Sequence, residues 1–289
     1  MYLFYFRPDD DKHLYKLDSS LKKNTAFIRK CKMINEGSKD QLIKEMKGLN
    51  LSKYIEELCQ GLVECKFKMS DISGVVEFCS AVHQLYPEFS VSLLENWGKV
   101  LAMKKEDKVA NPSKLRVDLR LYSELISVGI FTLKESLSLL GNVLTTLVAQ
   151  DKESLSNISI IISFCKHCGD DYAGLLPYSI EKLAEKYGYT LPRADLLPPE
   201  KQKPLRNILK GYYQCLSNAL LTIHKDVSML ERGNRRQLLT RGEISTERKE
   251  RLEKLQQEKE KLLLNTAQMA EAVGEEMVVL PSHQSEKES

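Results

Sequence analysis

Apolar residues recur along most of this chain at the three- and four-residue spacing of a helix with one buried face. The pattern is clear between residues 51 and 63 and between residues 72 and 86, and it returns at 133–148, 158–165 and 205–223. Alternation with a period of two, which would indicate half-buried strands, is almost absent. The sequence therefore predicts an all-α fold.

Helix start and stop signals agree with these apolar faces. Asn111 precedes Pro112 as an N-cap before a first-turn proline, and Thr132 with Glu135 forms a capping box. Gly129 and Gly169 are expected to be left-handed C-caps.

The expected helix starts form two interleaved series with one period. The first series lies near residues 70, 112 and 154, at intervals of 42, and the second near 50, 90, 132 and 174, at intervals of 40, 42 and 42. A period of about 40–47 residues is typical of HEAT-like or armadillo-like helix pairs, which bury their faces only by stacking. We expect an α-solenoid of antiparallel HEAT-like helix hairpins.

The repeat is expected to break after Pro204. A longer helix should run to about Glu231, a turn should follow at residues 232–236, and a charged helix should begin at Ser245. We expect residues 1–16 to be an unstructured or partial lead-in, residues 17–265 to form the repeat domain, and residues 266–289 to be a disordered tail.

Composition narrows the class of protein. The 289 residues carry 43 basic and 40 acidic side chains, a net charge of +3, so any basic surface must be local. No run approaches the roughly 18 apolar residues of a membrane helix, and we expect no membrane partner. Seven irregularly spaced cysteines favour free thiols in a reducing, intracellular compartment over a disulfide framework.

The nearest approach to a chemical motif is Cys165-Lys166-His167-Cys168. Two thiols at this spacing can form a redox pair or offer two zinc ligands, but a structural zinc site needs about four ligands. Cys165 also continues the apolar face that begins at Ile158, which favours a structural role. A thiol or zinc enzyme using Cys165 and Cys168 is the outside alternative, and we expect no catalytic residue, cofactor or metal.

Two basic clusters are the better candidates for contact with RNA or a partner. One is Lys22 and Lys23 on the first helix, and the other is Arg232, Arg235, Arg236 and Arg241 around the expected late turn. Clustered arginines can bind phosphates or acidic protein, although no aromatic side chains lie among them. The alternative is a solvated face, or one paired internally with acids such as Glu231 or Glu243.

Several strings resemble a known family, and together they cover about residues 17–264. They are LDSSLKKNTAF from Leu17, GLNLSKYI from Gly48, KLRVDLRL from Lys114, VGIFT from Val128, ISFCKHCGDDYAGLLP from Ile162, and NRRQLL with RGEIS after Asn234. They resemble the up-frameshift-two family of regulators of nonsense transcripts, and specifically its first middle domain of the initiation-factor-four-gamma type.

The resemblance implies a crescent of HEAT-like helix pairs without catalytic residues, acting as a cytoplasmic scaffold, with a perinuclear position as the alternative. Such proteins bridge the surveillance helicase of nonsense-mediated mRNA decay to an exon-junction-bound factor. Their best-defined partner surfaces belong to a third domain and a C-terminal tail outside these 289 residues. RNA is a further candidate partner, and a translation-initiation-type scaffold of the same fold is the alternative function.

Overall fold

The computed structural model describes residues 14–281, except for the side chains of residues 152–154. The chain divides into two compact units, with the division inside a long helix, after Leu147. Each unit has its own buried core.

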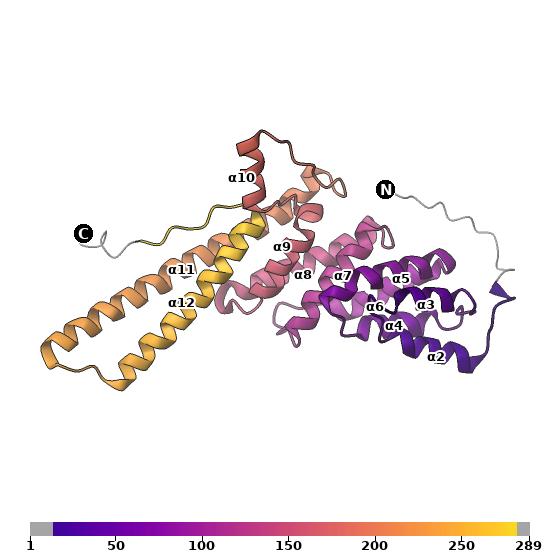
Figure 1. Ribbon diagram of the computed structural model, residues 1–289, viewed down its shortest axis with the longest axis horizontal. Helices are drawn as coiled ribbons and strands as arrows, with labels where there is room; N and C mark the ends of the chain where they lie inside the picture. Colours follow the sequence, from indigo (N-terminus) through magenta and orange to yellow (C-terminus); the bar gives the residue numbers. More distant parts are fainter. Residues whose placement is uncertain (1–13, 282–289) are drawn as a thin grey trace. The chain divides into compact units, whose positions relative to one another are not determined.

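The first unit stacks alternate helices in two layers. Helix α4 contacts both α2 and α6, while α5 contacts both α3 and α7, so helices two apart along the chain are neighbours (Figure 1). This is the arrangement expected of stacked helix hairpins. The elements are α2 (Leu21–Cys31), α3 (Lys39–Met46), α4 (Ile55–Glu64), the short 3₁₀ helix η1 (Met69–Asp71), α5 (Ile72–Leu85), α6 (Glu88–Leu101), α7 (Pro112–Ser127) and most of α8 (Leu133–Ser154).

Aromatic side chains hold the layers of the first unit together. The hydroxyl of Tyr86 donates to the carbonyl of Leu49 and accepts from the N–H of Leu51, both at 3.0 Å. Trp97 packs edge-on against Tyr122 with ring centroids 6.2 Å apart. All three side chains are fully buried, and the hydroxyl of Tyr86 also fixes the approach of residues 49–51.

The second unit is built on a long helical hairpin. Its elements are the end of α8, then α9 (Ile158–Ala173), α10 (Tyr178–Tyr187), α11 (Pro199–Arg241) and α12 (Thr246–Val273). Helices α11 and α12 lie side by side along their length, α9 contacts both of them, and α10 contacts α12 (Figure 1). The helix α9 and the helix α10 lie near one end of the hairpin, whereas the turn between α11 and α12 is at the other end.

The predicted all-α class and repeat are confirmed. Helices α5, α7 and α9 begin at residues 72, 112 and 158, at intervals of 40 and 46, and α4, α6, α8 and α10 begin at residues 55, 88, 133 and 178. The intervals are less regular than the sequence suggested. Between residues 14 and 281 the strand-like pairing is one isolated bridge, which joins Asp18 to Leu49.

Two predicted helix ends differ from the structure. Gly169 lies inside α9, and the left-handed C-cap is Gly174, with φ +58°. The expected break at residues 232–236 is helical, and α11 ends at Gly242 with φ +75°. Asn234 is buried and its Oδ1 accepts from Nε of Arg248 on α12, at 2.9 Å, so pairing between the two helices overrides the local turn signal.

The C-terminal boundary also differs from the expected tail at residue 266. Helix α12 continues to Val273, because Met269, Ala270 and Val273 are buried. Residues 274–281 then lie on α11: the hydroxyl of Tyr213 donates to the carbonyl of Glu276 at 2.7 Å, and the N–H of Val278 donates back to it at 3.0 Å. Residues 282–289 and 1–13 fall outside the described residues. Within the described part, no helix is long and apolar enough to cross a membrane.

Candidate functional site

The two thiols of the Cys165–Cys168 motif are buried in α9. Cys165 is 4% exposed and Cys168 is 2% exposed. Burial raises the pKa of the Cys165 thiol well above its ordinary value, so the thiolate that nucleophilic or metal chemistry requires is disfavoured. The predicted place of Cys165 on the buried apolar face of α9 is confirmed. Among the described residues, no three His, Cys, Asp or Glu side chains gather as metal ligands.

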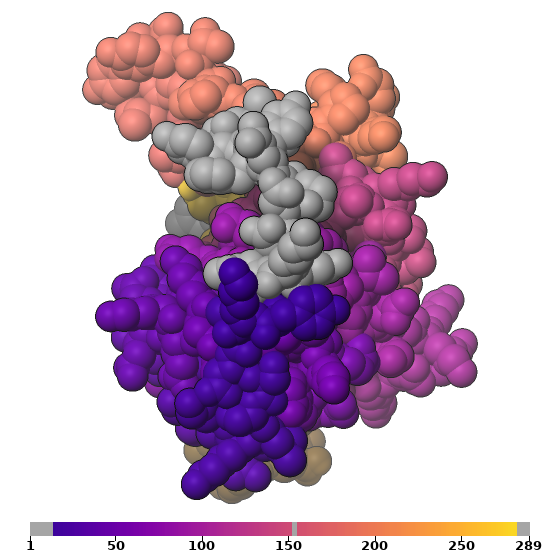
Figure 2. Space-filling view, turned by 90° about the vertical axis from the view of Figure 1, so that its right-hand side faces the viewer, coloured from indigo at the N-terminus to yellow at the C-terminus, as the bar shows by residue number. Residues whose placement is uncertain are grey.

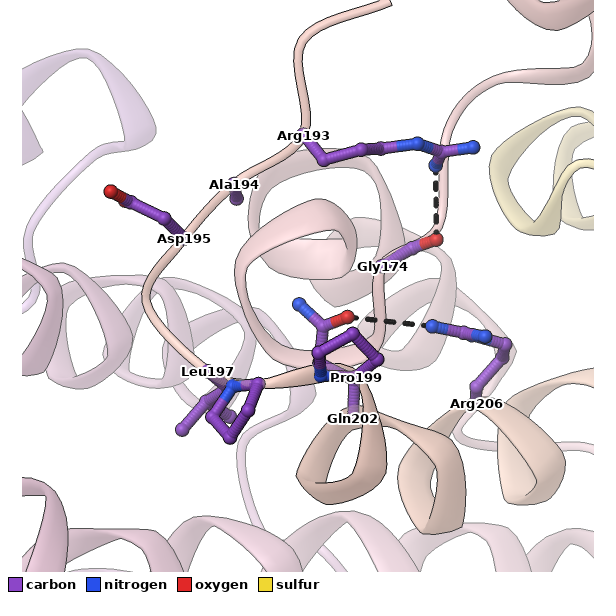
Figure 3. Close-up of a pocket in the computed structure, with 9 residues that line it drawn as sticks. Gly174, Arg193, Ala194, Asp195, Leu197, Pro199, Gln202 and Arg206 are labelled. Atoms are coloured by element: carbon purple, nitrogen blue, oxygen red, sulfur yellow. Dashed lines mark hydrogen bonds between the residues drawn. The ribbon is translucent and has the colours of Figure 1, made fainter.

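A pocket lies in the second unit, between the C-terminal end of α9 and the start of α11 (Figure 3). It is an open hollow of about 540 Å³. The residues that line it are Gly174, Arg193, Ala194, Asp195, Leu197, Pro198, Pro199, Gln202 and Arg206. This lining contains no thiol, hydroxyl or imidazole group that could act as a nucleophile or as its activating base.

The two arginines of this pocket donate hydrogen bonds to the C-terminal end of α9. Arg206 Nε donates to the carbonyl of Ala173 at 2.6 Å, and Arg193 Nη1 donates to the carbonyl of Gly174 at 3.3 Å. These carbonyls belong to the last turn and cap of α9, which lack partners inside the helix and attract positive charge. Gly174 is required here, because a Cβ would lie 2.6 Å from both Arg206 Nη2 and Gln202 Oε1. The pocket is therefore a structural junction.

The first basic cluster lies on the outer face of α2. This helix is at the surface in the view of Figure 2, where it is drawn in indigo. Lys22 and Lys23 are both exposed. Lys23 Nζ lies 2.5 Å from Asp18 Oδ2, so its charge is paired locally, while Lys22 remains open to solvent. As an exposed pair, Lys23 and Asp18 contribute little to stability.

The second basic cluster lies in the second unit, at the end of the hairpin far from α9. Arg232, Arg235, Arg236 and Arg241 are all exposed on α11 instead of forming a turn. Arg232 Nε donates to the carbonyl of Ser228 at 3.4 Å. Arg235, Arg236 and Arg241 form no ion pair with any residue that the structure describes, and Glu231 accepts instead from Gln256 Nε2 at 2.8 Å. The internal pairing weighed from the sequence is not observed for these three arginines.

Sequence reasoning missed the apolar side chains among these arginines. Leu239 is 81% exposed, Met229 is 54% exposed and Leu238 is 48% exposed. The sequence does contain a signal for this mixed surface. Residues 225, 229, 232, 236 and 239 have the spacing that places basic and apolar side chains on one stripe of a continuous helix. The expected turn at residues 232–236 concealed it.

Comparison with known proteins identifies the kind of domain. Residues 21–265 match the MIF4G domain. The chain is 44% identical over 275 residues to the human Regulator of nonsense transcripts 2, covering 95% of this chain and 22% of that protein. It is 32% identical over 286 residues to the Arabidopsis thaliana Regulator of nonsense transcripts UPF2, covering 95% of this chain and 23% of the relative. The chain thus spans less than a quarter of the length of these curated relatives.

A solved structure shows the same likeness in three dimensions. The crystal structure of the first MIF4G domain of the human nonsense-mediated decay factor UPF2 matches with a TM-score of 0.89 and 44% sequence identity. The match covers 95% of this chain and 89% of that one. Both the fold and the length of the described domain therefore correspond to that first domain.

Proposed function

This chain belongs to the MIF4G domain family, and on that premise we propose that it is a non-catalytic scaffold domain of nonsense-mediated mRNA decay. The observation that carries the proposal is its likeness, over nearly the whole chain, to the first MIF4G domain of a named decay factor. The domain would act by holding protein partners of the decay complex in the cytoplasm. The surveillance helicase and the exon-junction-bound factor are the expected members of that complex.

The chemistry of the described residues supports a scaffold. The thiols of Cys165 and Cys168 are buried, and the pocket beside α9 is lined by two arginines that hydrogen-bond to the end of that helix. The exposed cations that form no ion pair with the described residues are instead Lys22 on α2 and Lys225, Arg235, Arg236 and Arg241 on α11. Groups of this kind recognise carboxylates or phosphates, which is binding chemistry.

A co-purification experiment tests the proposal. The chain, carrying an affinity tag, is expressed in cells, and the captured surveillance helicase and translation-initiation helicase are quantified with and without ribonuclease. We expect enrichment of decay proteins that survives ribonuclease, and no enrichment of the initiation helicase. Capture of the initiation helicase alone would overturn the proposal in favour of an initiation-type scaffold. Loss of all decay proteins on ribonuclease treatment would assign the contact to RNA.

A further inference from the structure

One face of α11 carries a continuous stripe of exposed side chains toward the far end of the hairpin. Its members are spaced four, seven, eleven and fourteen residues from the first, so they lie along a single line on the helix. At a rise of 1.5 Å per residue the stripe is about 21 Å long. The basic stripe, as we call it, consists of Lys225, Met229, Arg232, Arg236 and Leu239, all of which are exposed.

The stripe combines positive charge with apolar surface. Lys225 and Arg236 form no ion pair with residues of the described part of the chain. Between residues 232 and 244 there are four arginines and a single acidic residue, Glu243. Leu239 is 81% exposed and Met229 is 54% exposed, so a partner on this face could bury apolar surface as well as pair with the charges.

The apolar members favour a protein partner over RNA. Single-stranded RNA binds by phosphate contacts together with base stacking on aromatic rings. The sequence contains no Phe, Trp or Tyr after Tyr213, so the hairpin end offers no ring on which a base could stack. Met229 and Leu239 would stay exposed under an RNA strand, whereas a partner with its own apolar side chains would bury them.

We propose that the basic stripe binds an acidic amphipathic helix of a partner protein, about four turns long. Carboxylates of that helix pair with Lys225, Arg232 and Arg236, and its apolar side chains cover Met229 and Leu239. The guanidinium groups suit this role because each can bind a carboxylate with two parallel hydrogen bonds. The inference rests on the proposed scaffold function, since it names the kind of partner that the scaffold holds.

Fluorescence anisotropy with a defined probe tests the inference. The probe is a labelled peptide of about 16 residues with leucines along one helical face and glutamates flanking them. Its control has the same composition with the leucines spread around the helix. An oligouridine RNA and vesicles containing phosphatidylserine are the other two probes. We expect the amphipathic peptide to bind at least about tenfold more tightly than the spread peptide, and with an affinity that falls as salt rises.

Two variants of the stripe and one matched control locate the binding. Arg232→Glu with Arg236→Glu removes the charge, and Met229→Ser with Leu239→Ser removes the apolar surface. The control, Arg251→Glu with Lys254→Glu, reverses two exposed charges on α12. Each stripe variant should weaken peptide binding about tenfold or more, and the control by less than about threefold. All six changed positions are exposed, so the melting temperatures should stay close to that of the unmodified chain.

Several outcomes would overturn the inference. These are equal weakening by the control and the charge variant, equal affinity for the two peptides, or unchanged binding in the Met229→Ser, Leu239→Ser variant. Tighter stripe-dependent binding of oligouridine or of vesicles would assign the surface to RNA or to membranes instead. If the charge variant still co-purifies with decay proteins at the unmodified level, the stripe is not the contact, and the scaffold function itself stands.

Discussion

The hydroxyl of Tyr212 on α11 donates a 2.7 Å hydrogen bond to the carboxylate of Asp151 at the end of α8. Asp151 has no exposed surface and also accepts from the N–H of Asn157 at 2.8 Å. Burial raises the pKa of Asp151, and the hydrogen bonds from Tyr212 and Asn157 partly offset that rise. One buried carboxylate therefore joins the end of α8, the start of α9 and the middle of α11.

Replacing Tyr212 with Phe should destabilise the second unit. The change leaves an oxygen of Asp151 buried without one of its donors, which costs about 1–3 kcal/mol. Urea denaturation followed by circular dichroism measures the loss. Tyr187→Phe is the matched control, because Tyr187 is 61% exposed and its hydroxyl reaches water in either case. Equal stability of the two variants would contradict the role assigned to Tyr212.

Asp118 should make the first unit more stable at mildly acidic pH. This side chain is 3% exposed, and although Lys114 Nζ lies 2.6 Å from its Oδ2, burial raises its pKa from 3.8 to about 6. The folded state therefore binds a proton between about pH 4 and 6 that the unfolded state does not. This contribution to the free energy of unfolding is fully present below the pKa that Asp118 has in the unfolded state. It is lost as the pH rises through about 6, the pKa in the folded state.

The Asp118→Asn variant isolates this effect. Between pH 7 and pH 5 the free energy of unfolding of the unmodified chain should rise relative to that of the variant, by on the order of 1 kcal/mol. Urea denaturation of both proteins at the two pH values gives the difference. Parallel pH dependence of the two proteins would show that Asp118 titrates normally.

The cysteines should divide into one reactive and six unreactive thiols under native conditions. Cys215 is exposed, whereas Cys31, Cys59, Cys65, Cys79, Cys165 and Cys168 are buried. Labelling with a disulfide reagent should modify one thiol quickly and the others only as the chain unfolds, and Cys215→Ser should remove the fast phase.

Cys165→Ala should cost on the order of 1 kcal/mol of stability through lost buried volume, with no change in metal content. Thermal denaturation and elemental analysis of the purified protein measure the two quantities. Stoichiometric zinc that disappears in this variant would contradict the structural role of Cys165.

The sequence alone predicts a helix end correctly where a single capping residue determines the backbone conformation. Asn111 was predicted as the N-cap of a helix beginning at Pro112, and its Oδ1 accepts from the N–H of Lys114 at 3.0 Å. Gly129 was predicted as a left-handed cap, and its φ is +82°. Both outcomes follow from a side chain, or the lack of one, acting within a few residues.

The sequence does not predict the conformation correctly where packing against a helix distant in the chain determines it. Gly233 and Asn234 indicated a turn, but Gly233 lies inside α11, where a Cβ would be 3.1 Å from Nη2 of Arg248 on α12. The arginines of the candidate site were identified from their clustering alone. Their exposure, and the lack of acidic partners for Arg235 and Arg236 among the described residues, required the packing of α12 to be known.

The segment after α12 should be released by a single substitution. Tyr213→Phe removes the hydroxyl that bonds both Glu276 and Val278, worth about 0.5–1.5 kcal/mol for each bond. We expect faster hydrogen exchange at the amide of Val278 and at its neighbours, with little change in α9. Mass spectrometry after exchange resolves the two regions. Uniform acceleration across the second unit would instead mean that Tyr213 supports the whole core.

Substitutions at the two ends of the α11–α12 hairpin should have different effects on folding. Residues near α9 are held by packing, and most changes there would reduce the folded fraction. The exposed positions toward Gly242 are in contact with water, so substitutions there leave folding almost unchanged. Proteins that share this domain can therefore diverge in what the hairpin end recognises while retaining the same packed core around α9.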